Sequence, residues 1–269
     1  MSILVSLKVS ESKRLIAKGV VASPMFRQAR EAGRILIIKG TTNAYIVEEL
    51  TGEGIDKLSF ARGLTLPHGL QRRPPRGEPL GDVLVEGNRV DLNAEMADVI
   101  DTLGPGDLIL KGANALNYGR GLAGVLIGDS RSGTIGMALR KAVGSHVPLM
   151  VPVGLEKEIA GDVIEVARFL QRPGHRGEAM MPVWGSIFTE IEALEVLTGL
   201  RARHVASGGV SGAEGAVWLA LEGEEQQLEA ARALLQVVPS APPAPTGEEP
   251  QLEAVRVLFE GIYGEPNLT

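Results

Sequence analysis

Three glycine-rich loops carry the side chains that could bind an anionic ligand. The first follows an apolar run at residues 34–39 and consists of Gly40, Thr41, Thr42 and Asn43. A strand that turns through glycine into a helix exposes free backbone N–H groups and the positive end of the helix dipole. Hydroxyl and amide donors beside that turn suit a phosphate or a carboxylate. The alternative is that Thr42 or Asn43 simply caps the helix.

The second loop follows another apolar run, at residues 107–110, and contains Lys111, Gly112 and Asn114. Ligands of open parallel sheets bind beyond the carboxyl ends of the strands, so two such loops predict one shared site. Lys111 adds a positive charge, and Asn114 can both donate and accept hydrogen bonds. The alternative is a buried lysine stem with an asparagine that tolerates the left-handed backbone of a turn.

The third loop combines charged, hydroxyl and glycine residues ahead of a helix. Its candidate binding residues are Arg131, Ser132, Gly133 and Thr134. A guanidinium and hydroxyls on flexible backbone are favourable for a phosphate, although the order of residues is not that of a P-loop. Asp129 is the candidate catalytic base, since proton transfer needs a positioned acid–base group. The alternative for Asp129 is an ion pair with Arg131.

Four cations are expected to form a positive pocket on an otherwise acidic protein of net charge −6. They are Lys39, Lys111, Arg120 and Arg131. The histidines show no catalytic triad and no H-x-x-x-H spacing, and the chain has no cysteine. We therefore expect no metal, no cofactor and no nucleic-acid partner.

The elements that position these loops predict an α/β fold. Apolar runs at 34–39, 107–111 and 146–153 indicate strands buried on both faces. Helical patterns cover residues 10–32 with a break at Pro24, then 44–50 and 135–143. The result is a mostly parallel open sheet flanked by helices. Further expected elements are strands at 58–66 and 82–90, a helix at 95–103, a glycine-dense stretch at 119–136, and a strand or helix at 162–169.

A second, smaller unit follows. A helix at 189–197, strands at 201–207 and 215–221, and a helix at 224–235 are typical of a ferredoxin-like α+β unit, which is also a candidate dimerisation surface. The expected organisation is an anion-binding domain at 1–180, the small domain at 181–238, a Pro-rich linker at 239–250 and a C-terminal docking helix at 251–269.

The chain shows no targeting or membrane signal. Its first twelve residues lack the basic and apolar regions of a signal peptide, and no run of about 18 apolar residues occurs. We therefore expect a cytoplasmic protein without a membrane partner, and a homo-oligomer.

The three loops together resemble the ribose-5-phosphate isomerase/CoA-transferase-like superfamily. The first resembles its strand–G-x-T–helix opening. The stretches 106–115, 132–139 and 146–151 resemble the run D-x-x-x-x-G-A-[DN], G-T, A and V-P, and the resemblance covers about residues 30–155. It implies a sheet edge that binds a phosphorylated small molecule, such as a sugar phosphate, a nucleotide or a CoA-type compound.

The chain departs from the isomerases of that superfamily in its acidic residues. Their D-G-A-D-E segment corresponds here to residues 111–115, which contain asparagine and no carboxylate. Three functions are therefore open. The first is metabolite binding with isomerase or transferase chemistry, and the alternative is a non-catalytic sensing or regulatory module. The third is a scaffold whose glycine-rich loops are only turns.

Overall fold

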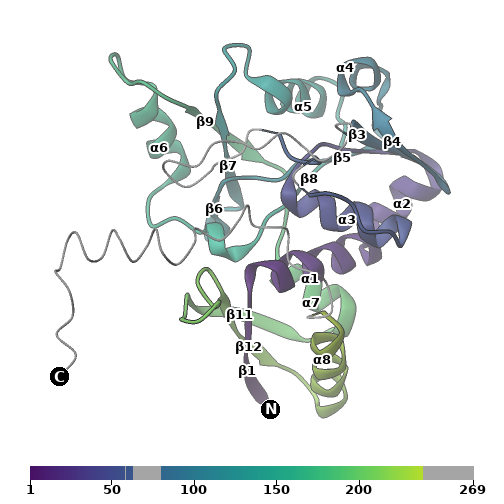
Figure 1. The fold of residues 1–269 in the computed structure, drawn as a ribbon, viewed down its shortest axis with the longest axis vertical. Coiled ribbons are helices and arrows are strands. Elements are labelled where there is room, and N and C mark those ends of the chain that lie inside the picture. The colour runs from purple at the N-terminus through teal and green to yellow at the C-terminus, as the bar shows by residue number, and fades with distance from the viewer. Residues whose placement is uncertain (58, 63–79, 239–269) are drawn as a thin grey trace, which may run out of the picture.

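The computed structural model describes residues 1–57, 59–62 and 80–238, and within them the chain is an α/β protein (Figure 1). Its central sheet has six strands in the order β10-β8-β5-β2-β3-β4. Strands β10, β8, β5 and β2 pair in parallel, whereas β3 pairs antiparallel with both β2 and β4. These strands are β2 (Arg34–Ile37), β3 (Asp82–Glu86), β4 (Arg89–Ala94), β5 (Leu108–Leu110), β8 (Leu149–Pro152) and β10 (Ser186–Phe188). The prediction of a mostly parallel sheet flanked by helices is confirmed.

Helices cover both faces of this sheet (Figure 1). They are α1 (Val9–Ala22), α2 (Pro24–Ala32), α3 (Thr41–Thr51), α4 (Met96–Val99) and α5 (Gly133–Gly144), and a 3₁₀ turn, η1 (Ile100–Thr102), follows α4. The predicted break between α1 and α2 lies at Ser23, whose hydroxyl accepts a hydrogen bond from the Phe26 N–H, with Pro24 in the first turn.

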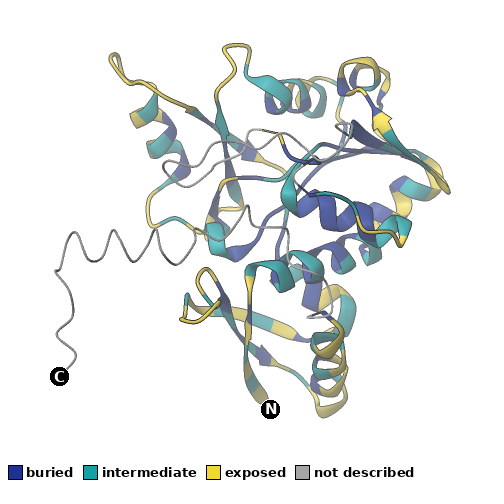
Figure 2. Cartoon of the chain, in the orientation of Figure 1, coloured by how far each residue is buried: buried dark blue, intermediate teal, exposed yellow. Residues whose placement is uncertain are grey.

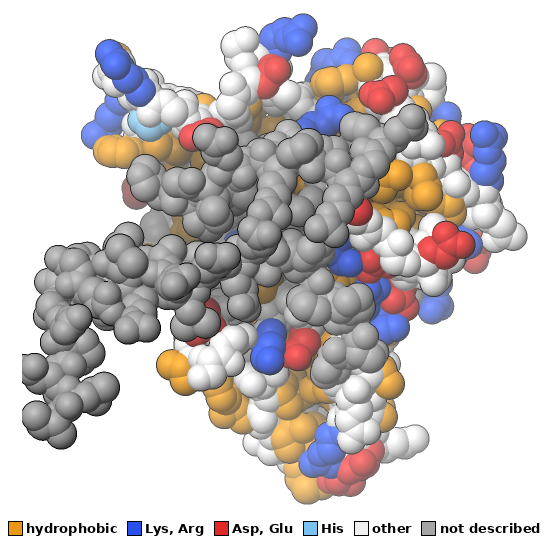
Figure 3. Space-filling view, viewed as in Figure 1, with side chains coloured by type: hydrophobic (Ala, Val, Ile, Leu, Met, Phe, Trp, Pro, Cys, Tyr) orange, Lys and Arg blue, Asp and Glu red, His pale blue; other side chains and the backbone are white. Residues whose placement is uncertain are grey.

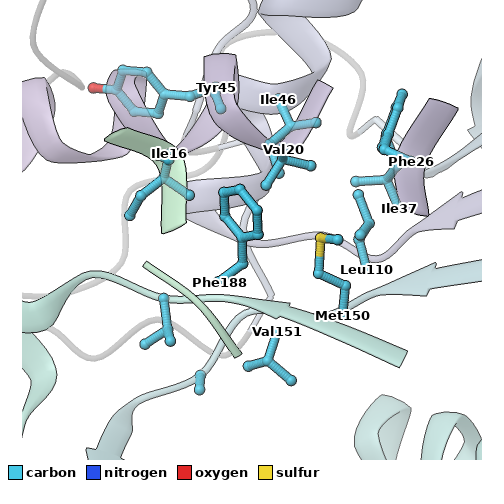
Figure 4. Packing of buried hydrophobic residues seen from close by; sticks show 14 of the residues in the cluster. Ile16, Val20, Phe26, Ile37, Tyr45, Ile46, Leu110, Met150, Val151 and Phe188 are labelled. Carbon is cyan, nitrogen blue, oxygen red and sulfur yellow. The ribbon is translucent and has the colours of Figure 1, made fainter. Parts of the chain in front are cut away.

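The core lies between the strands and α1, α2 and α3. Figure 4 shows side chains of the sheet and of these helices in contact across that layer, among them Ile16, Val20, Phe26, Ile37, Ile46, Leu110, Met150 and Phe188. Figure 2 shows that buried residues concentrate in the central strands and in α3. The strands are short and apolar because both of their faces are covered.

A second, antiparallel sheet contains β6 (Ala115–Asn117), β7 (Leu122–Ile127) and β9 (Ala179–Trp184), with α6 (Val163–Leu170) packed against it. The sequence predicted only a glycine-dense stretch where β7 lies. Gly124 interrupts the apolar pattern of β7 because a Cβ there would come within 2.8 Å of the Met180 Sδ atom on β9. Of the two alternatives for residues 162–169, the helix is correct, and Asp162 caps it.

The small unit lies at the bottom of Figure 1 and contains β1 (Ser2–Leu7), α7 (Glu190–Thr198), β11 (Arg201–Ser207), β12 (Val217–Glu222) and α8 (Glu225–Val237). Its antiparallel sheet has the order β1-β12-β11. Residues 2–7 were expected within the 1–180 unit, but they form β1, which pairs with β12. Helix α1 contacts α7 closely, since a Cβ on Gly19 would lie 2.5 Å from the Ala193 Cα atom.

Other expected elements are shifted or shorter. Residues 82–90 contain β3 and the turn into β4, and residues 95–103 form α4 and η1. Of the expected strand at 58–66, residues 59–62 form a turn and coil, and the rest lies outside the described residues. The expected linker at 239–250 and helix at 251–269 also lie outside them. No helix within the described residues is long and apolar enough to span a membrane.

Candidate functional site

A cavity of about 620 Å³ lies at the carboxyl ends of β2 and β5, and we call it the strand-end cavity. Its described lining comes from the ends of these strands, from β7 and from the starts of α3 and α5. These residues are Lys13, Lys39, Gly40, Thr41, Thr42, Ala61, Arg62, Lys111, Gly112, Ala113, Asn114, Val125, Leu126, Ile127, Gly128, Asp129, Ser132, Gly133, Thr134, Ile135 and Lys157. The three loops identified in the sequence therefore converge on one cavity.

Most of the sequence-predicted site residues line this cavity. Those that do are Gly40, Thr41, Thr42, Lys111, Gly112, Asn114, Asp129, Ser132, Gly133 and Thr134. Asn43 and Arg131 are not part of the described lining. Arg120 lies elsewhere, in an ion pair with Asp162 at the start of α6.

Asn43 has a structural role. Its side chain is fully buried, and its Nδ2 atom donates to the Ile38 oxygen at 2.8 Å and to the Leu110 oxygen at 3.2 Å. These two bonds join the carboxyl ends of β2 and β5 to the first turn of α3. Asn43 therefore shapes the cavity wall from behind rather than facing a ligand.

Two helix N-termini open into the strand-end cavity. Gly40 precedes α3 and Ser132 precedes α5, and neither helix start receives a side-chain capping hydrogen bond from a residue that the structure describes. The alternative in which Thr42 or Asn43 caps α3 is therefore wrong. Uncapped N–H groups together with the helix dipole favour an anion. Ser132 also adopts a left-handed backbone with φ of 66°, a strained conformation of the kind found at binding sites.

The cavity is strongly positive for a protein of net charge −6. Five cationic side chains line it, whereas Asp129 is the single carboxylate of its described lining. Figure 3 shows charges of both signs interspersed over the described surface of the face in view. The cavity thus concentrates positive charge that the described surface in that view does not share.

Lys13 and Lys157 each donate a hydrogen bond within the cavity wall. The Lys13 Nζ atom donates to the Thr41 Oγ1 atom at 3.2 Å, and the Lys157 Nζ atom donates to the Ala113 oxygen at 2.8 Å. Burial, together with the positive charge of Lys157, lowers the pKa of Lys13 to about 8, while Glu156 opposes that shift. A bound anion stabilises the charged forms of crowded, desolvated lysines of this kind.

Lys111 is perturbed in the same way. Burial lowers its pKa to about 8, and the charges of Lys157 and Arg62 act in the same direction against Asp82. Asp82 is fully buried at the start of β3, where its Oδ1 atom accepts the Lys39 N–H at 2.9 Å. Its Oδ2 atom lies 3.7 Å from the Arg62 guanidinium.

Asp129 and Asn114 line the cavity, but in each of them the Oδ1 atom accepts a hydrogen bond from a backbone N–H group. The Asp129 carboxylate, on an exposed residue, accepts the Arg131 N–H at 2.7 Å. The Asn114 Oδ1 atom accepts the Leu126 N–H at 3.0 Å, and no left-handed backbone occurs at Asn114. Asp129 is therefore held at the rim in a turn, which is a poor arrangement for a base.

The sequence analysis missed a buried carboxyl group at the same sheet edge. Glu190 follows β10, is fully buried, and accepts the Leu155 N–H at 3.0 Å. Burial and then the charge of Glu156 raise its pKa to about 7. Residues 155–157 follow β8, so the strand-end rule that pointed to Lys111 also identifies Lys157. No sequence signal places Lys13, because α1 brings it to the cavity by packing.

The free energy of unfolding should depend on the ionisation of Glu190. The folded state binds its proton more tightly than the unfolded state, so stability should fall as pH rises from about 4.5 to about 7. Glu190→Gln lacks this titration, so its free energy of unfolding should stay level where that of the wild type falls. The difference between the two proteins should therefore change by about 3 kcal/mol in favour of the variant between pH 4.5 and pH 7. Urea denaturation at successive pH values measures it. Glu165→Gln, on the exposed side of α6, is the matched control, and an equal trend in both variants would contradict the assignment.

Comparison with known proteins finds no family model, no curated protein and no solved structure that matches this chain, so its function is inferred from the strand-end cavity itself.

Proposed function

We propose that the strand-end cavity binds a small molecule through a phosphate group. The observation that carries this proposal is the joint presence of two uncapped helix N-termini and five cationic side chains around one cavity. Backbone N–H groups at a helix start and flanking cations are complementary to a phosphate dianion. A volume of about 620 Å³ is in the range of cavities that hold a metabolite of sugar phosphate or nucleotide size.

We further propose that the fold is isomerase/CoA-transferase-like, with a ferredoxin-like small unit. Loops at the carboxyl ends of parallel strands support the first part, since that is where such sheets bind ligands. The order β1-β12-β11 with α7 and α8 supports the second part.

The non-catalytic alternative, a sensing or regulatory module, has support from one observation. Asp129 is the single carboxylate of the described lining, and its hydrogen bond to the Arg131 N–H holds it at the exposed rim. Isomerase chemistry through a carboxylate base at Asp129 would require that turn to open. Binding is thus the primary proposal, and proton transfer by Asp129 is the part that Asp129→Asn tests.

Thermal unfolding with matched pairs of compounds tests the binding proposal. Sugar phosphates, nucleotides and CoA should raise the melting temperature, whereas the corresponding sugars and nucleosides should not. A ligand at 100 times its Kd adds about 2.7 kcal/mol of stability. Lys111→Met should reduce the shift, and Lys141→Met, in the last turn of α5 and not part of the described cavity lining, should retain it. Equal shifts from phosphorylated and dephosphorylated members of each pair would reject the proposal.

A further inference from the structure

Lys111 differs from Lys13 and Lys157 in its hydrogen bonding. The Nζ atoms of Lys13 and Lys157 each donate to a protein oxygen. Within the described residues, the Lys111 Nζ atom has no hydrogen-bond acceptor, although burial acts on it more strongly than any neighbouring charge. Lys111 is half-buried in the cavity wall, and partial desolvation there disfavours its charged form, so loss of the proton relieves that cost.

The surroundings of Lys111 make its neutral amine far more populated than that of an ordinary lysine. Positive charge comes from Lys157 on the segment after β8 and from Arg62, and Lys13 and Lys39 line the same cavity. The opposing group is Asp82, whose carboxylate is shared with the Lys39 N–H and Arg62. With a pKa of about 8, about a tenth of Lys111 carries a free lone pair at pH 7 and about half does at pH 8. Desolvated lysines among cations are effective nucleophiles.

We propose that Lys111 is a nucleophilic amine that attacks the carbonyl group of a small molecule bound through its anionic group in the strand-end cavity. The proposal rests on the proposed function, because the anionic group would be held by the N-termini of α3 and α5. It adds a reaction that needs no carboxylate base at Asp129. The substrate class is a carbonyl compound that also carries a phosphate or another dianionic group.

The step balances without an oxidant or a reductant. The lone pair of the Lys111 nitrogen forms a bond to the carbonyl carbon, and the π electrons of the carbonyl move to its oxygen. Transfer of a proton from nitrogen to that oxygen gives a carbinolamine. Loss of the oxygen together with the second nitrogen-bound proton releases water and leaves an imine. The alternative is that Lys111 contributes only a positive charge to anion binding.

Reductive trapping separates these two roles. Pyridoxal 5′-phosphate serves as a probe aldehyde that carries a phosphate, and borohydride reduces the imine to a stable secondary amine. Peptide mass spectrometry of the full chain should place the label on Lys111 at least tenfold faster than on Lys13 or Lys157. Inorganic phosphate should slow the labelling of Lys111, and pyridoxal without the phosphate should label it more slowly. With pyridoxal 5′-phosphate at saturating concentration, so that weaker phosphate binding at high pH does not limit the reaction, the labelling rate should rise with pH as Lys111 loses its proton.

Two variants and one binding measurement complete the test. Lys111→Arg should remove the labelled peptide, whereas Lys141→Arg should leave the labelling of Lys111 unchanged. If Lys111 stays unlabelled while inorganic phosphate still raises the melting temperature, the nucleophile is rejected and the binding function stands. If phosphate produces no thermal shift and no lysine is labelled selectively, both proposals are rejected.

Discussion

Sulfate binding at the strand-end cavity should weaken about 100-fold between pH 7 and pH 9. Sulfate is the appropriate probe because it keeps two negative charges throughout this range, so any pH dependence comes from the protein. Burial lowers the pKa values of Lys13 and Lys111 to about 8. Each lysine therefore changes from mostly charged to mostly neutral across the window, and each contributes about tenfold to the loss of affinity.

Lysine-to-arginine variants isolate this effect because arginine stays charged. The double variant Lys13→Arg with Lys111→Arg should bind sulfate with nearly the same affinity at both pH values, as measured by calorimetry. Lys141→Arg, which changes a lysine in the last turn of α5 that is not part of the described cavity lining, should retain the wild-type dependence. If the wild-type affinity is constant from pH 7 to pH 9, the two lysines do not contact the anion.

The same two lysines should also make the free energy of unfolding depend on pH, in the opposite direction to a lysine whose pKa is raised by an ion pair. Because the folded state holds their protons less tightly, the charged forms are unfavourable below about pH 8 and the free energy of unfolding rises as pH increases from about 8 toward 10.5. A bound dianion removes much of this penalty. Anion binding near pH 8 should therefore be accompanied by proton uptake.

The strand-end loops were accessible from the sequence because their rule is local. A short apolar run followed by glycine marks the carboxyl end of a buried strand, and this pattern located Gly40, Lys111 and their neighbours in one cavity. The same rule applied to residues 153–157 would have added Lys157. This rule cannot predict where a side chain points. Asn43 is of a residue type that often binds ligands, yet its amide donates to the Ile38 and Leu110 oxygens instead.

Other features depend on contacts between distant parts of the chain. Lys13 reaches the cavity because α1 packs on α3, and its hydrogen bond to Thr41 spans 28 residues. Strand β1 pairs with β12, so the small unit includes both ends of the described chain. Burial in β1 alternates, with Ile3, Val5 and Leu7 turned inward, but the sequence does not show this pattern because Leu4, which is also apolar, is exposed. Local sequence patterns therefore predict whether a segment forms a helix or a strand, whereas contacts between distant segments determine which elements lie together.

A buried ion cluster behind α3 shows how the first cavity loop is supported. Glu48 on α3 accepts hydrogen bonds from the Lys57 Nζ atom at 2.5 Å and from the Ile55 N–H at 3.0 Å, and it also pairs with Arg14 of α1. The Arg14 and Lys57 cations lie 4.8 Å and 4.6 Å from the centre of the Tyr45 ring. Burial alone would raise the pKa of Glu48, but hydrogen bonds from Lys57, Ile55 and Arg14 outweigh it and lower that pKa.

Glu48→Gln should lower the free energy of unfolding by about 3–5 kcal/mol at neutral pH. The side chains of Glu48 and Lys57 are only 6% and 4% exposed, so the substitution leaves Lys57 as a desolvated charge without its counter-ion. Urea denaturation measures the loss. Glu49→Gln is the matched control on the next residue, since Glu49 is 25% exposed and its pairs with Lys18 and with Arg14 should each contribute less than about 1 kcal/mol.

The paired variant identifies the unpaired charge as the cause. Replacing both partners, Glu48→Gln with Lys57→Met, removes the buried ammonium along with its counter-ion and should recover a large part of the stability lost in Glu48→Gln. Because α1 and α3 meet at this cluster, Glu48→Gln should also weaken sulfate binding through the Lys13–Thr41 contact. A cost for Glu48→Gln no larger than that for Glu49→Gln would show that the cluster does not hold α1 against α3.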